Sequence, residues 1–278
     1  MTYQMLCTDV DGTLLNNKGE ITEGNKKAVA AALAAGKKIV LCSGRTWHSL
    51  RIYENTLGLD IPGQYGIGFN GGAVYETVSP GEKRLLYSEQ MPRSIAREIF
   101  ATIEPIVAGY SEMYIVAYNN EGTLIAEASM ENMDKFDELR RLGARTVPKY
   151  TEVPGDMYKI LVHGKHEDLQ EIASFTREKF AGKCQTMFSA RSLLELLPLG
   201  VDKGRGITFL AAHLGIPLEA VIAVGDEAND IAMLQQAGLG IAVANAVPDA
   251  KAAADVKLTA THNEDAVGVA IHTYLCKS

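Results

Sequence analysis

The chain has 278 residues, of which 47% are hydrophobic and 22% charged, and a formal net charge of −7 at pH 7. A chain of this length buries roughly three quarters of the surface that its unfolded form exposes, so it can fold without disulfides or structural metals. The length also suggests two domains, or one core with a large insertion. The acidic balance argues against nucleic acid or an anionic membrane as a partner, because both attract basic surfaces.

Cysteine usage favours a reducing compartment, and we expect the cytoplasm. The four cysteines lie far apart and include no CxxC pair, which fits neither a disulfide framework nor a zinc site. We also expect no secretion signal, because Asp9 and Asp11 interrupt the apolar stretch near the N-terminus. A membrane helix needs about 20 predominantly apolar residues, and no stretch has that composition. The cysteines are Cys7, Cys42, Cys184 and Cys276.

Apolar runs alternate with longer amphipathic segments in the first and last thirds of the chain. Thr22 suits the N-cap of the first helix, and Gly36 suits its end. Strands that are continuously apolar, each followed by a helix, predict a parallel sheet with helices on both faces. The expected strands are 5–7, 38–42, 65–69, 220–224 and 240–243, and the expected helices are 22–36, 46–57, 203–214 and 229–237.

The middle of the chain has a different pattern, in which strands alternate polar and apolar residues. This pattern predicts an α+β module with a one-sided antiparallel sheet. The fold class is therefore α/β: a Rossmann-like parallel core of residues 1–84 and 192–278, with an inserted α+β domain of residues 85–191. The strands expected in the insertion include 114–118 and 123–126, and its helices are 94–107, 130–142 and 167–180.

Residues 9–13, DVDGT, directly follow the first expected strand and carry the strongest chemical signal. Asp9 and Asp11 are two residues apart, a spacing that can project both carboxylates to one side. Open α/β sheets bind ligands at the carboxyl ends of their parallel strands. Two carboxylates this close repel each other unless a cation or proton lies between them, and oxygen-only ligands favour Mg²⁺ over zinc.

A calcium loop of the EF-hand type is an alternative interpretation of the same residues. Asp9, Asp11, Thr13 and Glu20 fall at its positions 1, 3, 5 and 12. However, the glycine required at position 6 is Leu14 here, and a strand rather than a helix precedes the loop. The calcium interpretation is therefore disfavoured.

Three further polar clusters follow expected strands or precede expected helices. In the first, the Ser43 hydroxyl and the Gly44 amide could bind phosphate at a helix start, although Ser-Gly also marks an ordinary turn. In the second, Lys203 could neutralise a phosphate or simply be a charge at a helix start. In the third, residues 225–230 (GDEAND) place three carboxylates and an amide at a strand end, which favours a metal site over a solvated turn.

Other familiar motifs are excluded by their context or do not occur. Residues 66–71 match GxGxxG, but a strand-like segment follows them instead of a helix, which argues against a dinucleotide site. No GxSxG or HExxH motif is present, so the common serine and zinc hydrolases are excluded.

Together DVDGT, SGR, DKG and GDEAND, in this order, resemble the four motifs of the haloacid dehalogenase superfamily of phosphatases. The insertion between SGR and DKG resembles the α/β cap of the Cof-type (type IIB) subgroup by its size and position, and residues 240–265 resemble that subgroup as well. The resemblance implies a Mg²⁺-dependent phosphatase that hydrolyses small phosphorylated metabolites, such as sugar phosphates, through an aspartyl-phosphate.

The resemblance also implies individual roles. Asp9 would be the nucleophile, and Asp11 would protonate the leaving oxygen and then activate water. Mg²⁺ would be held by Asp9, the backbone carbonyl of Asp11, and Asp226. The phosphate-binding residues would be Val10, Ser43, Gly44, Lys203 and Asn229, with Asp230 and Asn70 in supporting positions.

Other functions remain as alternatives. A phosphomutase of the same superfamily would use the same intermediate and differ in its product. A non-enzymatic metal- or phosphate-binding protein is less favoured, because every residue that the chemistry requires is present. A sugar transferase that uses a DxD motif leaves Lys203 and residues 225–230 unexplained. The expected partner is a small phosphate ester, and the sequence leaves its identity and the oligomeric state open.

Overall fold

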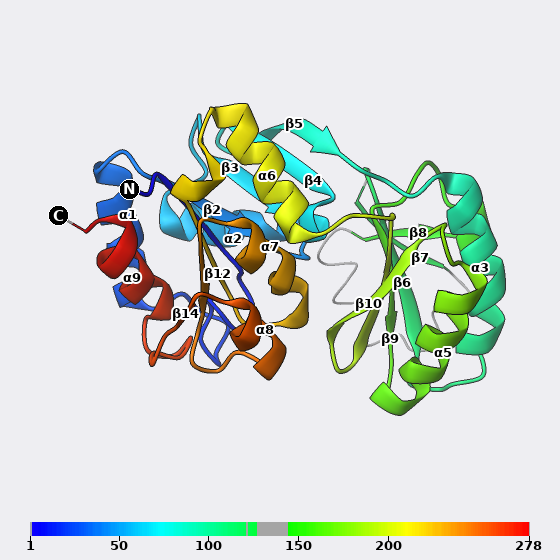
Figure 1. Cartoon of the computed structure of the whole chain (residues 1–278). Helices are drawn as coiled ribbons and strands as arrows, with labels where there is room; N and C mark the ends of the chain where they lie inside the picture. The colour runs from blue at the N-terminus through cyan, green and yellow to red at the C-terminus, as the bar shows by residue number, and fades with distance from the viewer. Residues whose placement is uncertain (1, 121, 127–143, 278) are drawn as a thin grey trace. The chain divides into compact units, whose positions relative to one another are not determined.

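The computed structural model describes residues 2–120, 122–126 and 144–277. The chain forms two compact units, the first of Met1–Ser88 with Val201–Ser278 and the second of Glu89–Gly200 (Figure 1). These borders differ from the predicted borders after residues 84 and 191. Strand β5 (Glu82–Ser88) completes the sheet of the first unit, and β11 (Leu193–Leu197) belongs to the sheet of the second.

The first unit is built on an eight-stranded sheet in the order β14-β13-β12-β1-β2-β3-β4-β5. The strands from β14 to β3 pair in parallel, and β4 and β5 add an antiparallel hairpin at one edge. The strands are β1 (Met5–Thr8), β2 (Lys38–Cys42), β3 (Tyr65–Gly68), β4 (Ala73–Ser79), β5 (Glu82–Ser88), β12 (Val221–Gly225), β13 (Leu239–Ala242) and β14 (Val256–Lys257).

Two groups of helices cover this sheet, which confirms the predicted α/β class. Helix α1 contacts α2 and α9 on one side, and α7 contacts α6 and α8 on the other side (Figure 1). The predicted N-cap of α1 is present, since the side chain of Thr22 accepts a hydrogen bond from the N–H of Asn25. The helices are α1 (Glu23–Ala34), α2 (Trp47–Leu57), α6 (Lys203–Leu214), α7 (Ile231–Gln236), α8 (Pro248–Ala253) and α9 (Ala266–Ala270).

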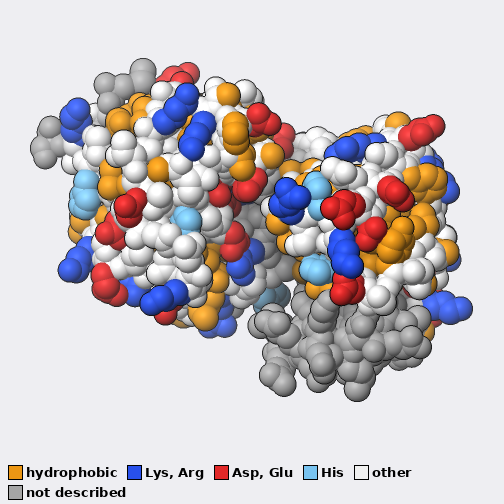
Figure 2. Space-filling model, turned by 90° about the horizontal axis from the view of Figure 1, so that it is seen from below, with side chains coloured by type: hydrophobic (Ala, Val, Ile, Leu, Met, Phe, Trp, Pro, Cys, Tyr) orange, Lys and Arg blue, Asp and Glu red, His pale blue; other side chains and the backbone are white. Residues whose placement is uncertain are grey.

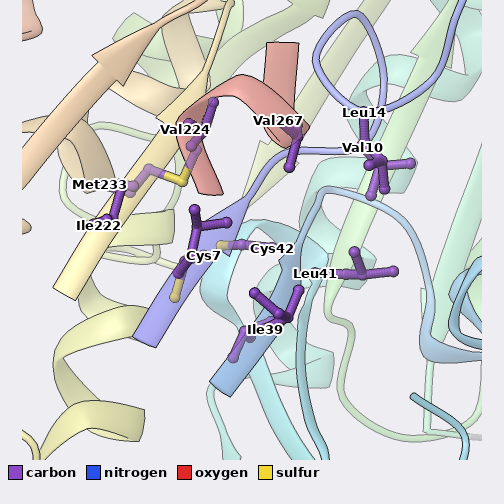
Figure 3. Packing of buried hydrophobic residues seen from close by; sticks show 14 of the residues in the cluster. Cys7, Val10, Leu14, Ile39, Leu41, Cys42, Ile222, Val224, Met233 and Val267 are labelled. Carbon is purple, nitrogen blue, oxygen red and sulfur yellow. The ribbon is translucent and has the colours of Figure 1, made fainter. Parts of the chain in front are cut away.

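A close-packed apolar core fixes the central strands of this unit. Figure 3 shows Cys7 and Cys42 among aliphatic side chains such as Ile39 and Val224. Both cysteines are fully buried free thiols, as expected for small core residues, and burial raises the pKa of each. Each large aliphatic side chain buried here contributes roughly 1.5–3 kcal/mol. The strand ends that carry the polar motifs are therefore held by a rigid core.

The second unit has a six-stranded sheet in the order β10-β11-β9-β6-β7-β8. Its pairs are antiparallel, as predicted, except that β7 and β8 are parallel. Helices α3 and α5 bury their apolar faces against the sheet. The predicted helix 130–142 lies outside the described residues. The elements are α3 (Arg93–Val107), β6 (Tyr114–Asn119), β7 (Gly122–Ala126), β8 (Arg145–Val147), β9 (Lys159–His163), α5 (His166–Lys179), β10 (Gln185–Ala190) and β11 (Leu193–Leu197).

The surface carries charges of both signs. Figure 2 shows lysine and arginine side chains interspersed with aspartate and glutamate side chains on the visible face. Within the described residues, every helix is too short or too polar to cross a membrane.

Candidate active site

The polar motifs of the first unit meet at the carboxyl ends of adjacent parallel strands. β1 lies between β12 and β2, and Thr8 at its end pairs with Val224 on one side and Leu41 on the other. The segments that follow these three strands therefore start at the same edge of the sheet. The chain order also reverses at β1, since β2 and β3 extend to one side and β12 and β13 to the other. Ligands of open α/β sheets bind at such a switch point.

Lys203, the first residue of α6, is fully buried and contacts two carboxylates. Its Nζ donates to Oδ1 of Asp9 at 2.6 Å and to Oδ1 of Asp230 at 2.5 Å. Burial alone would lower the pKa of this ammonium, but Asp230 and Asp9 outweigh burial and raise it. The lysine is therefore charged, and it fixes the orientation of the predicted nucleophile.

Asp230 stabilises the loop that follows β12 through hydrogen bonds to its backbone. Its Oδ2 accepts hydrogen bonds from the backbone N–H groups of Asp226 at 2.8 Å and Glu227 at 2.9 Å. Its other oxygen is held by Lys203. Because the loop closes on this carboxylate as a single 3₁₀ turn, the α-helix begins at Ile231 and not at the predicted residue 229.

Asp226 lies beside the DVDGT turn. Its Oδ1 accepts a hydrogen bond of 2.7 Å from the hydroxyl of Thr13. Burial raises the pKa of Asp226 to about 7, although the Thr13 bond lowers it, and neighbouring Asp230 adds to the rise. Gly12 has φ +78°, and a Cβ there would lie 2.3 Å from Oδ2 of Asp226. Only glycine allows this turn to approach the carboxylate so closely.

The acidic side chains of this site fit a hard divalent cation. Asp9, Asp226 and Asp230 are buried, and each offers an oxygen within 4.8 Å of those of the other two. Burial raises the pKa of Asp9 well above its usual range, more than Lys203 lowers it. Asp230 already accepts from Lys203 and two amides, so Asp9 and Asp226 are the carboxylates better placed to bind a cation. An all-oxygen set of this kind suits Mg²⁺.

The SGR loop, Asn70 and Asn229 are joined by hydrogen bonds. Ser43 is almost fully buried, and its carbonyl accepts the N–H of Asn70 at 3.0 Å. Nδ2 of Asn229 donates to Oδ1 of Asn70 at 3.1 Å. A Cβ on Gly44 would lie 3.0 Å from the same Asn70 oxygen, so the loop lies directly against that side chain. These contacts bring four of the predicted site residues together.

Asp11 takes a different partner from the other carboxylates. Its side chain is 56% exposed, and its two oxygens accept hydrogen bonds of 2.7 Å each from Nε and Nη2 of Arg45. The bond to Asp11 raises the pKa of Arg45. β1 ends at Thr8, so Asp9 and Asp11 lie in the turn that follows it, and their carboxylates contact different cations, Lys203 and Arg45. Val10, between them, is buried in the core.

The predicted phosphatase site did not include three residues that this geometry brings into it. Thr13 and Arg45 lie within DVDGT and SGR, so the motifs themselves were the signal that pointed to them. Asn245 had no local signal. Its Nδ2 donates to the carbonyl of Gly12 at 2.8 Å across a separation of 233 residues. Next to it, the N–H of Val247 donates to the carbonyl of Asp226 at 2.8 Å.

Comparison with known proteins places the chain in a family. The model of the haloacid dehalogenase-like hydrolases matches residues 6–271. A Bacillus subtilis (strain 168) protein named "Putative phosphatase YxeH" is 31% identical over 97% of each chain. From the same organism, the 5-amino-6-(5-phospho-D-ribitylamino)uracil phosphatase YwtE is 26% identical over 95% of each. The crystal structure of a haloacid dehalogenase-like hydrolase from Bacteroides thetaiotaomicron is 28% identical, with a TM-score of 0.83 over 97% of this chain and 98% of that one. The chain belongs to the haloacid dehalogenase-like hydrolase family, as its four motifs predict.

Proposed function

We propose that this chain is a Mg²⁺-dependent phosphatase that hydrolyses phosphate monoesters of small metabolites through an aspartyl-phosphate at Asp9. The family and its named phosphatases support the enzyme class, a phosphoric monoester hydrolase. The observation that carries the mechanism is the buried carboxylate of Asp9. It is held by Lys203 at the switch point of the sheet, in a cluster with Asp226.

In the first step, Asp9 attacks phosphorus and the bond from phosphorus to the leaving oxygen breaks. Asp11 gives its proton to that oxygen, so the leaving group departs as an alcohol. Lys203 offsets the charge repulsion between the carboxylate nucleophile and the phosphate dianion. The phosphoryl group would be bound by Val10, Ser43, Gly44, Lys203 and Asn229.

In the second step, water attacks phosphorus and Asp11 takes up the proton of that water. The bond between phosphorus and the Asp9 oxygen then breaks, which releases inorganic phosphate and restores the carboxylate. When bound, Mg²⁺ would supply further charge compensation for the phosphoryl group. The carboxylates of Asp9 and Asp226 and the backbone carbonyl of Asp11 would hold it.

We propose sugar or sugar-alcohol phosphates as the substrate class. The name of the relative YwtE gives it a phosphorylated ribityl compound as its substrate, which supports this class. The second unit, Glu89–Gly200, is the proposed cap domain, and it would select the leaving group. The cytoplasm remains the proposed location, because all four cysteines are free thiols.

The test is phosphate release from p-nitrophenyl phosphate and from a panel of sugar phosphates, with Mg²⁺ or with a chelator. We expect release that requires Mg²⁺ and is abolished in Asp9→Asn. The matched control is Asp249→Asn, the same change at an exposed position on α8, which should retain full activity. Release that survives both the chelator and Asp9→Asn would refute the proposal. An isomeric sugar phosphate as the product, formed only with a bisphosphate primer, would identify a mutase instead.

A further inference from the structure

Arg45 and Asp11 form a bidentate salt bridge. Nε of the guanidinium donates to Oδ2 of the carboxylate and Nη2 donates to Oδ1, both at 2.7 Å. Such a fork fixes the plane of a carboxylate as well as its position, which a single contact from a lysine does not do.

Arg45 is itself held in place at three points. Its backbone N–H donates to Oγ of Ser43 at 3.2 Å, and its carbonyl accepts from the N–H of Phe69 at 3.0 Å. Its guanidinium carbon lies 5.4 Å from the ring centroid of Tyr53 on α2, a distance typical of cation–π contact. The fork therefore projects from a fixed part of the site and is not a loose surface side chain.

The pair contributes little to the stability of the fold. The two side chains are 35% and 56% exposed, and ion pairs at such positions are worth about 0–1 kcal/mol. The buried contacts of Lys203 are different, because they compensate charges that are removed from water. A function in orienting Asp11 explains the geometry of the Arg45 pair better than a contribution to folding does.

We propose that Arg45 is a positioning residue that orients the carboxyl group of Asp11 for its two proton transfers, in which one oxygen keeps its hydrogen bond to Arg45 while the other carries the proton. This inference rests on the proposed phosphatase function, in which Asp11 must point at the leaving oxygen and later at water. Asp11 is half exposed, and the Arg45 fork is the contact that the structure records for its carboxylate. Without the fork, its carboxyl group would sample several rotamers and would spend less time in reach of the reacting oxygen.

The test is a double-mutant cycle in kcat/KM, with Arg45→Met, Asp11→Asn and the double variant. A positioned acid supplies about 10²–10⁴-fold, so we expect Arg45→Met to lower kcat/KM for a sugar phosphate about tenfold. In the Asp11→Asn background the same change should have almost no further effect, because the group that Arg45 orients is gone. For p-nitrophenyl phosphate, whose leaving group needs no proton, the Arg45→Met loss in kcat/KM should be much smaller.

Arg51→Met is the matched control. Arg51 is a half-exposed arginine on α2 that pairs with Asp60 at 3.3 Å, a pair that includes no motif residue, so its removal should leave kcat/KM unchanged. Thermal unfolding of both arginine variants should stay close to that of the wild type, which excludes misfolding as the cause of a loss.

Three results would overturn the inference. The first is that Arg45→Met leaves kcat/KM for sugar phosphates unchanged. The second is that the losses of the two single variants multiply in the double variant. The third is that Arg45→Met raises KM without lowering kcat. The last result would mean that Arg45 binds the substrate directly. After any of these three results, the proposed phosphatase function would still hold if the wild-type activity requires Mg²⁺ and Asp9. A wild-type protein without phosphatase activity would instead refute both the proposed function and the inference about Arg45.

Discussion

Lys203 is one buried cation among three buried carboxylates, so the site has fewer positive than negative groups to balance one another. It hydrogen-bonds to Asp9 and Asp230, while Asp226 has only the hydroxyl of Thr13 as its side-chain donor among the described residues. Burial therefore raises the pKa of both Asp9 and Asp226 above the usual carboxyl range. A bound cation would reverse that effect, because it favours the ionised forms.

The raised pKa of Asp226 predicts how the stability of the metal-free protein depends on pH. The pKa of Asp226 is about 7 in the folded state and 3.8 in the reference state. At pH values between these two, the Asp226 carboxyl is protonated in the folded state and ionised in the unfolded state. The stabilising contribution is complete below the reference value and is lost as pH rises through about 7. With a chelator present, we expect the unfolding temperature to fall as pH rises from about 4 to about 7 and to change little above that.

Two measurements make this prediction specific to Asp226. Asp226→Asn, which cannot ionise, should have a flatter stability profile over the same pH range. Added Mg²⁺ should raise the unfolding temperature of the wild type more at the upper end of the range, because the carboxylate binds the cation. An equal slope in the variant, or a larger Mg²⁺ effect at the lower end, would contradict the assignment.

At the scale of elements, a buried ion network connects the antiparallel hairpin β4–β5 to helix α2. Nζ of Lys83 on β5 donates to Glu54 on α2 at 2.6 Å, to Asp60 at 3.1 Å and to the hydroxyl of Thr77 on β4 at 2.7 Å. The side chains of the lysine and both carboxylates are at most 4% exposed. The network therefore links α2 to both strands of the hairpin.

Lys83→Met should destabilise the first unit by about 3–5 kcal/mol, because it leaves the buried carboxylate of Glu54 without a cation and Asp60 with only the half-exposed Arg51. Lys26→Met is the matched control. It breaks a pair with the exposed Glu23 on α1, which solvent screens, so the loss should be far smaller. Urea unfolding of the two variants measures both values. Equal losses in the free energy of unfolding would show that the Lys83 network does not stabilise the hairpin.

Many elements of the core could be predicted from local sequence, because their signals are local. Apolar runs gave the central strands, and α6 occupies the predicted residues, Lys203–Leu214, after its Asp202 cap. The resemblance to the haloacid dehalogenase superfamily then implied that Asp9 and Asp226 would lie close together. The border of the second unit was harder to predict, because Leu193–Leu197 (LLELL) is an apolar run that suits a strand of either sheet.

The parts of the site that could not be predicted depend on how distant loops meet. The Asn245 bond to Gly12 joins turns 233 residues apart, and no local pattern marks it. The Arg45 fork likewise joins the turn after β1 to the loop after β2, across a separation of 34 residues. Element ends are the least certain part of a sequence prediction, and the side chains of this site lie in the loops beyond them.

At the scale of the whole molecule, the candidate site is assembled from both ends of the chain within one unit. DVDGT and SGR precede the second unit in sequence, and DKG and GDEAND follow it, yet all four lie in the first unit. The second unit contributes none of the motif residues. The proposed chemistry therefore belongs to the first unit.

The covalent intermediate at Asp9 is the central claim, and trapping it is the most direct test. In Asp11→Asn, p-nitrophenyl phosphate should phosphorylate the enzyme, because its leaving group needs no proton, and hydrolysis of the intermediate should then stall. Acid quenching, digestion and mass spectrometry should find one phosphoryl group on the peptide that contains Asp9, and none in Asp9→Asn. A phosphoryl group on another residue, or a burst of nitrophenol without a phosphorylated peptide, would contradict the account.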